Sequence, residues 1–153
     1  MDTLDTTPTG LGTLYCFGYG KLKGPDDLAS LIDGEKIDVV MDIRYMPTGR
    51  NPLWRSGLVA ETTHKGGIPE YQYVKGLGNP DFKSGLPATR VHNEAEGMAT
   101  LMDALGSGRN VALMCVCGDT PHCHRRLIVA KARQLRPDLR LVELEVGKAP
   151  QRS

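Results

Sequence analysis

The chain has 153 residues, of which 40% are hydrophobic, so it is long enough for one hydrophobic core and too short for two ordinary domains. Its 19 Lys and Arg residues nearly balance its 18 Asp and Glu residues, which excludes a globally basic nucleic-acid coat protein. No apolar stretch approaches the roughly 20 residues that span a bilayer, and no basic segment followed by an apolar one opens the chain. We therefore expect a cytoplasmic protein with no membrane partner.

Apolar periodicity predicts a single α/β domain over residues 13–146, between a loose lead-in at 1–12 and a flexible tail at 147–153. The predicted strands are 13–19, 38–43, 71–74, 111–115 and 139–146, and the predicted helices are 25–32, 56–64, 94–105 and 127–135. Asn93 and Glu96 have the spacing of a helix N-cap. This alternation predicts a three-layer sandwich with a mostly parallel sheet of about five strands flanked by helices.

The first two predicted strands end in residues suited to an anion. Gly18-Tyr19-Gly20 closes the first strand, where a glycine-rich turn brings backbone N–H groups close to a ligand. Asp42 and Arg44 lie at the end of the second strand with one residue between them, so they share one face. In such a pair each side chain can orient the other, or the two together can bind a ligand. Alternatively, Arg44 is an ordinary surface residue whose charge is solvated.

Residues 115–126 gather three of the four cysteines, two of the four histidines and two arginines into one strand-to-helix turn. Cys123 stands near the start of the helix, where the helix dipole and Arg125 lower the pKa of a thiol and favour the thiolate. Cys123 is therefore the first candidate nucleophile, and Cys117 is the second. Cys115 ends a buried strand and is best explained as a core residue.

The spacing within this turn weakens two other assignments. A cysteine phosphatase needs an arginine six positions after its nucleophile, but Cys123 stands six positions after Cys117, and Arg125 follows two residues later. Zinc is the second assignment, with Cys115, Cys117, His122 and Cys123 as its ligands. Structural zinc sites usually combine two separated ligand pairs, and this cluster has no clear second pair. No metal or other cofactor is therefore required.

Three motifs occur together: Phe17-Gly18-Tyr19-Gly20; Val40-Met41-Asp42-Ile43-Arg44 with Pro47 and Arg50; and Cys115 through Pro121 to Cys123-His124-Arg125. In this combination the chain resembles domain-of-unknown-function family 488 from about residue 13 to 135. The resemblance implies a compact α/β domain with these motifs around one pocket, and it implies no reaction. Family members often have a serine at Gly49, a histidine at Tyr73 and an acid at Cys117, so roles of those side chains do not transfer.

The leading hypothesis is an enzyme-like protein with an anion or phosphate pocket at the strand ends, acting on a nucleotide, a nucleic acid or another phosphate-bearing small molecule. The candidate anion-binding residues are Arg44, Arg50 and Arg125 with Gly18, Tyr19 and Gly20, and the candidate catalytic residues are Cys123 or Cys117 as nucleophile and His124 or Asp42 as acid or base. A non-catalytic nucleotide-binding or nucleic-acid-binding module is the first alternative. A zinc-stabilised structural or partner-binding domain is the second. We expect Cys123-His124-Arg125 to meet Asp42-Ile43-Arg44 across neighbouring strand ends.

Overall fold

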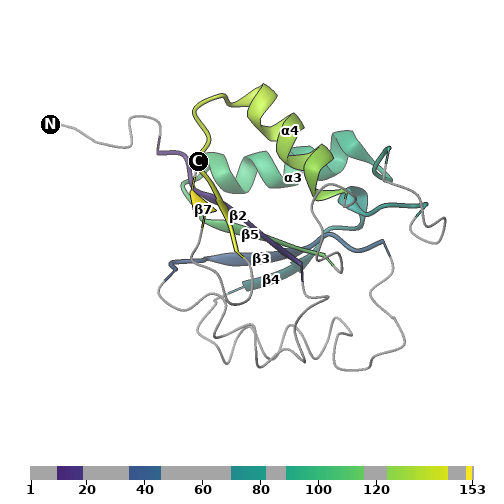
Figure 1. The fold of residues 1–153 in the computed structure, drawn as a ribbon, viewed down its shortest axis with the longest axis horizontal. Coiled ribbons are helices and arrows are strands. Elements are labelled where there is room, and N and C mark those ends of the chain that lie inside the picture. The colour runs from purple at the N-terminus through teal and green to yellow at the C-terminus, as the bar shows by residue number, and fades with distance from the viewer. Residues whose placement is uncertain are drawn as a thin grey trace, which may run out of the picture.

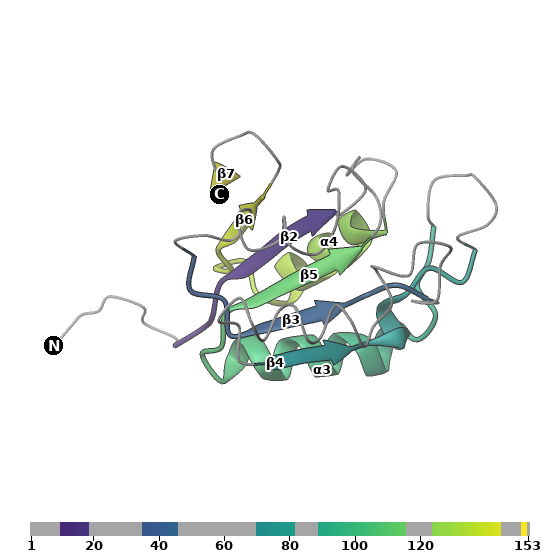
Figure 2. The same ribbon diagram turned by 90° about the horizontal axis from the view of Figure 1, so that it is seen from below.

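The structure is a computed structural model that describes residues 10–18, 35–45, 70–81, 89–115, 124–144 and 151–152. Its strands are β2 (Leu14–Gly18), β3 (Val39–Asp42), β4 (Glu70–Tyr73), β5 (Val111–Cys115), β6 (Leu141–Glu143) and β7 (Gln151–Arg152). They form one sheet in the order β4-β3-β5-β2-β6-β7, in which the first five strands run parallel and β7 pairs antiparallel with β6. Figure 2 shows the arrows of β2, β5, β3 and β4 pointing the same way. The predicted α/β class and the mostly parallel sheet are confirmed.

The helices α3 (Glu94–Gly106) and α4 (Arg125–Leu135) both cover one face of the sheet (Figure 1). Each connects a strand to a parallel strand further along the sheet in the same direction, and right-handed crossovers then place both helices on the same side. Leu101 and Leu105 of α3 and Ile128 of α4 are buried against this face. The expected helices at 25–32 and 56–64 lie outside the described residues.

The face of the sheet opposite α3 and α4 is buried as well. Phe17, Val40, Ala112 and Met114 each have 0% exposure and belong to a second apolar cluster. Strands that are buried on both faces have continuous apolar sequences, because neither side of the strand contacts water. This double burial explains why β3 and β5 were predictable from their sequences alone.

The predicted start of α3 agrees with the structure, whereas some elements elsewhere in the chain differ from the prediction. The side chain of Asn93 accepts a hydrogen bond from the Glu96 N–H, so the predicted N-cap is confirmed. The short 3-10 helix η2 (Lys75–Leu77) and the strand β7 were not predicted, and β6 is shorter than expected. Within the described ranges, no helix combines the length and the apolar character needed to cross a membrane.

Asn110 connects three strands at their amino ends. Its Oδ1 accepts from the Thr13 N–H at 2.9 Å, ahead of β2, and its Nδ2 donates to the Lys36 carbonyl at 2.6 Å, ahead of β3. Its own N–H donates to a carboxylate oxygen of Asp38 at 2.8 Å. Asn110 itself immediately precedes β5. One side chain therefore helps to align the starts of β2, β3 and β5.

Candidate functional site

The carboxyl ends of β3 and β5 lie side by side, and the chain leaves them in opposite directions along the sheet. From β3 it continues to β4 at one edge, and from β5 it continues through α4 to β6 on the far side of β2. Open α/β sheets bind ligands where neighbouring connections diverge in this way. The register pairs Asp42 with Met114 and Gly18 with Cys115, so three of the predicted motifs meet at the ends of adjacent strands.

Asp42 and Arg44 form a buried ion pair at the end of β3. The guanidinium donates Nε–H to Oδ1 at 2.7 Å and Nη2–H to Oδ2 at 2.5 Å, and the Arg44 backbone N–H also donates to Oδ1 at 3.2 Å. The side chains are 0% and 7% exposed, respectively. Charges removed from water require close partners, and this fork-to-carboxylate geometry supplies them. The pair therefore holds the arginine in one orientation.

Tyr71 on β4 is a further member of the site. Its hydroxyl donates to Oδ2 of Asp42, which gives the carboxylate a fourth hydrogen bond. Burial and the neighbouring Asp42 carboxylate raise the pKa of the Tyr71 hydroxyl above its ordinary value of 10.0, so the side chain stays protonated as a donor. Tyr71 lies in the predicted strand 71–74 but was not among the predicted site residues. The register of β3 against β4 places Tyr71 diagonal to Asp42, so the sequence held no local signal for this contact.

The start of α4 is joined to the end of β3 through His124. The imidazole Nε2 lies 2.7 Å from the carbonyl oxygen of Ile43, and the ring is 6% exposed. Because a carbonyl oxygen only accepts, Nε2 carries the hydrogen in this contact. The hydrogen bond confirms that the start of α4 meets the segment between Asp42 and Arg44.

Arg125 is the first residue of α4 and is 3% exposed. The first turn of this helix holds no acidic residue, and its N-cap residue, His124, makes no side-chain capping hydrogen bond. A buried arginine beside the positive end of a helix dipole gives this part of the site positive potential. The buried polar and charged residues in the described ranges are Asp42, Arg44, His124 and Arg125, and all four lie at the end of β3 or at the start of α4.

Other predicted site residues lie outside the described residues: Tyr19, Gly20, Arg50, Cys117, His122 and Cys123. Cys115 is placed as the last residue of β5, and Cys16 is a buried core residue on β2. Three of the four suggested zinc ligands are thus among the undescribed residues. In the parts of the chain that are described, no three His, Cys, Asp or Glu side chains come together as a metal site.

A family model described as a domain of unknown function, DUF488, matches residues 25–132, more than half of the chain. The chain belongs to this family. The match to DUF488 contains β3, β4, α3, β5 and most of α4, and therefore both strand ends that form the site. The resemblance inferred from the motifs is confirmed. Searches of curated proteins and of solved structures each found no match.

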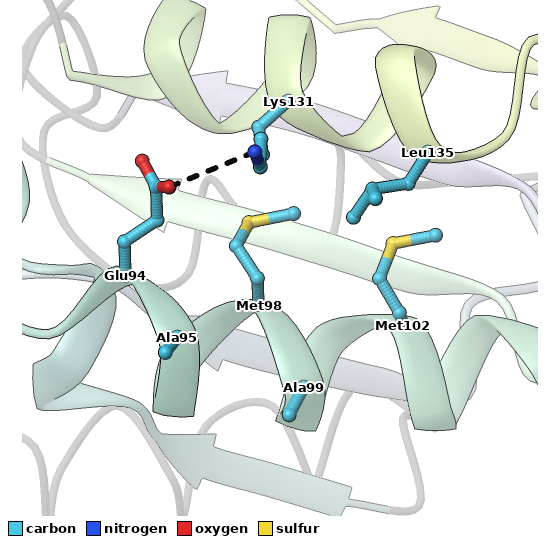
Figure 3. Close-up of a pocket in the computed structure, with 7 residues that line it drawn as sticks. All are labelled: Glu94, Ala95, Met98, Ala99, Met102, Lys131 and Leu135. Carbon is cyan, nitrogen blue, oxygen red and sulfur yellow. Dashed lines mark ion pairs between the residues drawn. The ribbon is translucent and has the colours of Figure 1, made fainter.

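The DUF488 domain also has a groove of about 300 Å³ between α3 and α4 (Figure 3). Met98, Met102 and Leu135 line it, and Lys131 Nζ lies 3.9 Å from Glu94 Oε1 at one end (Figure 3). The groove lies between the helices. Asp42 shares the opposite face of the sheet with Val40, because strand side chains alternate. The groove is therefore separate from the strand-end site.

Proposed function

We propose that this protein is an enzyme that binds a phosphate-bearing compound at the carboxyl ends of β3 and β5. The observation that carries the proposal is the burial of two guanidinium groups, Arg44 just after β3 and Arg125 at the start of α4, beside the carboxyl ends of the strands. Both arginines lie where the strand connections diverge, and Arg125 opens a helix whose first turn holds no acidic residue. Each of these features favours an anion, and arginine matches the oxygens of phosphate with its forked donors.

The proposed roles follow from the hydrogen bonds. Arg125, together with Arg44 and Arg50, binds the anion, and Cys123 or Cys117 is the nucleophile. Asp42 orients Arg44, because its two oxygens already accept four hydrogen bonds.

His124 is the better acid or base of the two candidates. Its Nε2–H donates to the Ile43 carbonyl, so in a neutral ring Nδ1 is the nitrogen that accepts a proton. We also propose a cytoplasmic location, where cysteine thiols stay reduced.

Titration calorimetry with inorganic phosphate and a panel of nucleotides tests the anion site. We expect Arg125→Gln to weaken binding at least tenfold, because a charge-assisted hydrogen bond is worth about 1.5–3 kcal/mol. Arg125→Lys keeps the charge but loses the forked pair of donors, so its affinity should lie between those of Arg125→Gln and the wild type. Arg140→Gln is the matched control, since Arg140 is exposed just before β6 at the other end of the sheet. Equal affinities for wild type and a folded Arg125→Gln protein would contradict the proposal.

Cysteine variants test the enzymatic part. Cys123→Ser or Cys117→Ser should abolish turnover of the compound found by titration while leaving its binding within about twofold, because the nucleophile contributes to the reaction more than to affinity. Full turnover by both folded variants would remove the cysteine mechanism. Tight binding without any turnover would instead identify a non-catalytic nucleotide-binding or nucleic-acid-binding module.

A further inference from the structure

Tyr45, the residue after Arg44, gathers basic side chains at the surface. Lys75 Nζ lies 4.7 Å from the centre of the Tyr45 ring, and the His92 ring packs against the same ring at 75°, with 5.2 Å between centroids. The Tyr73 hydroxyl donates to the Tyr45 backbone carbonyl at 2.5 Å. We refer to Tyr45, Tyr73, Lys75 and His92 as the tyrosine cluster. Its members come from three separate segments of the chain.

The tyrosine cluster faces solvent and presents the ammonium group of Lys75 beside the imidazole of His92. Tyr73 is 38% exposed, and Lys75 and His92 are exposed as well. Arg90, two residues before His92, donates two hydrogen bonds to the Asp81 carboxylate, at 2.9 and 3.1 Å.

Glu94, the nearest acid along the chain to His92, is directed toward Lys131 in the groove between the helices (Figure 3). Exposed cation–π contacts contribute little to stability, so folding alone does not account for this collection of basic groups.

The tyrosine cluster adjoins the strand-end site. Tyr45 follows Arg44 directly, and Tyr73 is paired in register with Asp42. A polymer with regularly spaced phosphates can contact the strand-end site and the tyrosine cluster together. The exposed Tyr73 ring adds an aromatic surface beside the basic groups.

We infer that the tyrosine cluster binds single-stranded nucleic acid, an inference that rests on the proposed function and names its phosphate-bearing compound. Lys75 and His92 contact a backbone phosphate next to the one held by Arg125, and the Tyr73 ring stacks on a base. Aromatic rings placed beside basic side chains are the recurring chemistry of single-strand binding, because every base offers a π face. A duplex hides those faces within its stack, so it is bound more weakly.

Fluorescence anisotropy of the full chain with labelled short oligothymidylate and oligouridylate strands tests the inference. Lys75→Gln should weaken binding about fivefold at low salt and reduce the slope of log K against log salt by about 0.7, the value for one phosphate contact on a single strand. Lys36→Gln is the matched control, because Lys36 is exposed ahead of β3 at the opposite edge of the sheet. It should leave both quantities unchanged.

The aromatic contact has its own pair of variants. Tyr73→Leu should weaken binding about tenfold, and Tyr73→Phe should retain it, since stacking requires the ring and not the hydroxyl. A duplex of the same length should bind more weakly than either single strand. Equal effects of Lys75→Gln and Lys36→Gln, or an intact affinity in Tyr73→Leu, would overturn the inference.

Two further measurements separate this inference from the proposed function. If inorganic phosphate binds in an Arg125-dependent manner but no oligonucleotide binds, the proposed function stands and the tyrosine cluster has been wrongly assigned. If inorganic polyphosphate displaces the strands completely at equal phosphate concentration, base recognition is excluded and the inference fails. If the strands bind in a Lys75-dependent manner but Arg125→Gln has no effect on any ligand, the cluster is supported and the strand-end site is not.

Discussion

His124 Nε2 lies 2.7 Å from the carbonyl oxygen of Ile43 and so joins the first residues of α4 to the end of β3. We expect His124→Ala to lower the free energy of unfolding by about 1–3 kcal/mol, because the buried carbonyl loses its partner. Gln134→Ala, an exposed change on the same helix, should stay within about 0.5 kcal/mol of the wild type. Urea denaturation measures both. Similar values for the two variants would show that the contact does not hold the helix in place.

The buried Asp42–Arg44 pair has an exposed counterpart in Arg136 and Asp138. Both pairs join residues two apart through Nε and Nη2, and the exposed pair has distances of 3.1 and 2.9 Å. Asp42→Ala should cost about 3–5 kcal/mol, because it removes the carboxylate that is hydrogen-bonded to a buried guanidinium. Asp138→Ala should cost less than about 1 kcal/mol, because solvent screens the exposed pair.

A double-mutant cycle completes this comparison. Arg44→Leu combined with Asp42→Ala should cost clearly less than the sum of the single changes, because neither charge is then left alone. Additive costs would indicate that the two side chains contribute independently.

The raised pKa of Tyr71 leads us to expect a loss of stability at alkaline pH. Burial and the Asp42 carboxylate raise the pKa of its hydroxyl in the folded state above the ordinary value of 10.0. Above that pH the unfolded chain loses the proton while the folded protein keeps it, so the free energy of unfolding falls as pH rises. The contribution is fully present below pH 10 and decreases by up to about 1.4 kcal/mol per pH unit above it. Denaturant titrations across this range should show a shallower decline for Tyr71→Phe. Identical slopes would contradict the assignment.

Gly78 allows η2 to approach the backbone of Tyr45. A Cβ at Gly78 would lie 2.6 Å from Tyr45 Cα and 2.7 Å from Tyr45 N, and backbone atoms cannot move aside cheaply. Gly78→Ala should therefore lower the free energy of unfolding by about 1–3 kcal/mol. Gly106→Ala is the control, because nothing lies within 4 Å of its Cβ and a helical alanine should add about 0.4–1 kcal/mol. Thermal unfolding should move in opposite directions for the two variants. A shift in the same direction would contradict the packing argument.

The sequence predicts the central strands well because their patterns are local. Val39–Asp42 and Val111–Cys115 are continuous apolar runs that end in polar or reactive residues, and both became neighbouring parallel strands. Their pairing brings the predicted motifs to one edge of the sheet. The roles assigned to Cys117 and Cys123 stay predictions.

Contacts between distant segments could not be predicted in the same way. The Tyr71–Asp42 hydrogen bond spans 29 residues and depends on the register of two strands. The Tyr45–His92 contact joins irregular backbone, which leaves no periodic trace in the sequence. Gln151–Arg152 has no apolar alternation, and Arg152 pairs with Glu35 at 3.0 Å from far along the chain. Tertiary context decided these features.

Asn110 lies at the amino ends of the strands, and it affects the geometry at their carboxyl ends. β2 and β5 match residue for residue from Leu14 and Val111 to Gly18 and Cys115, and an extended strand is nearly inextensible. A shift of one strand relative to its neighbour, introduced where Asn110 bonds to Thr13 and Lys36, would therefore reach the carboxyl ends of the strands undiminished. The spacing between the functional groups of the site is thus determined in part by an amide that no ligand touches.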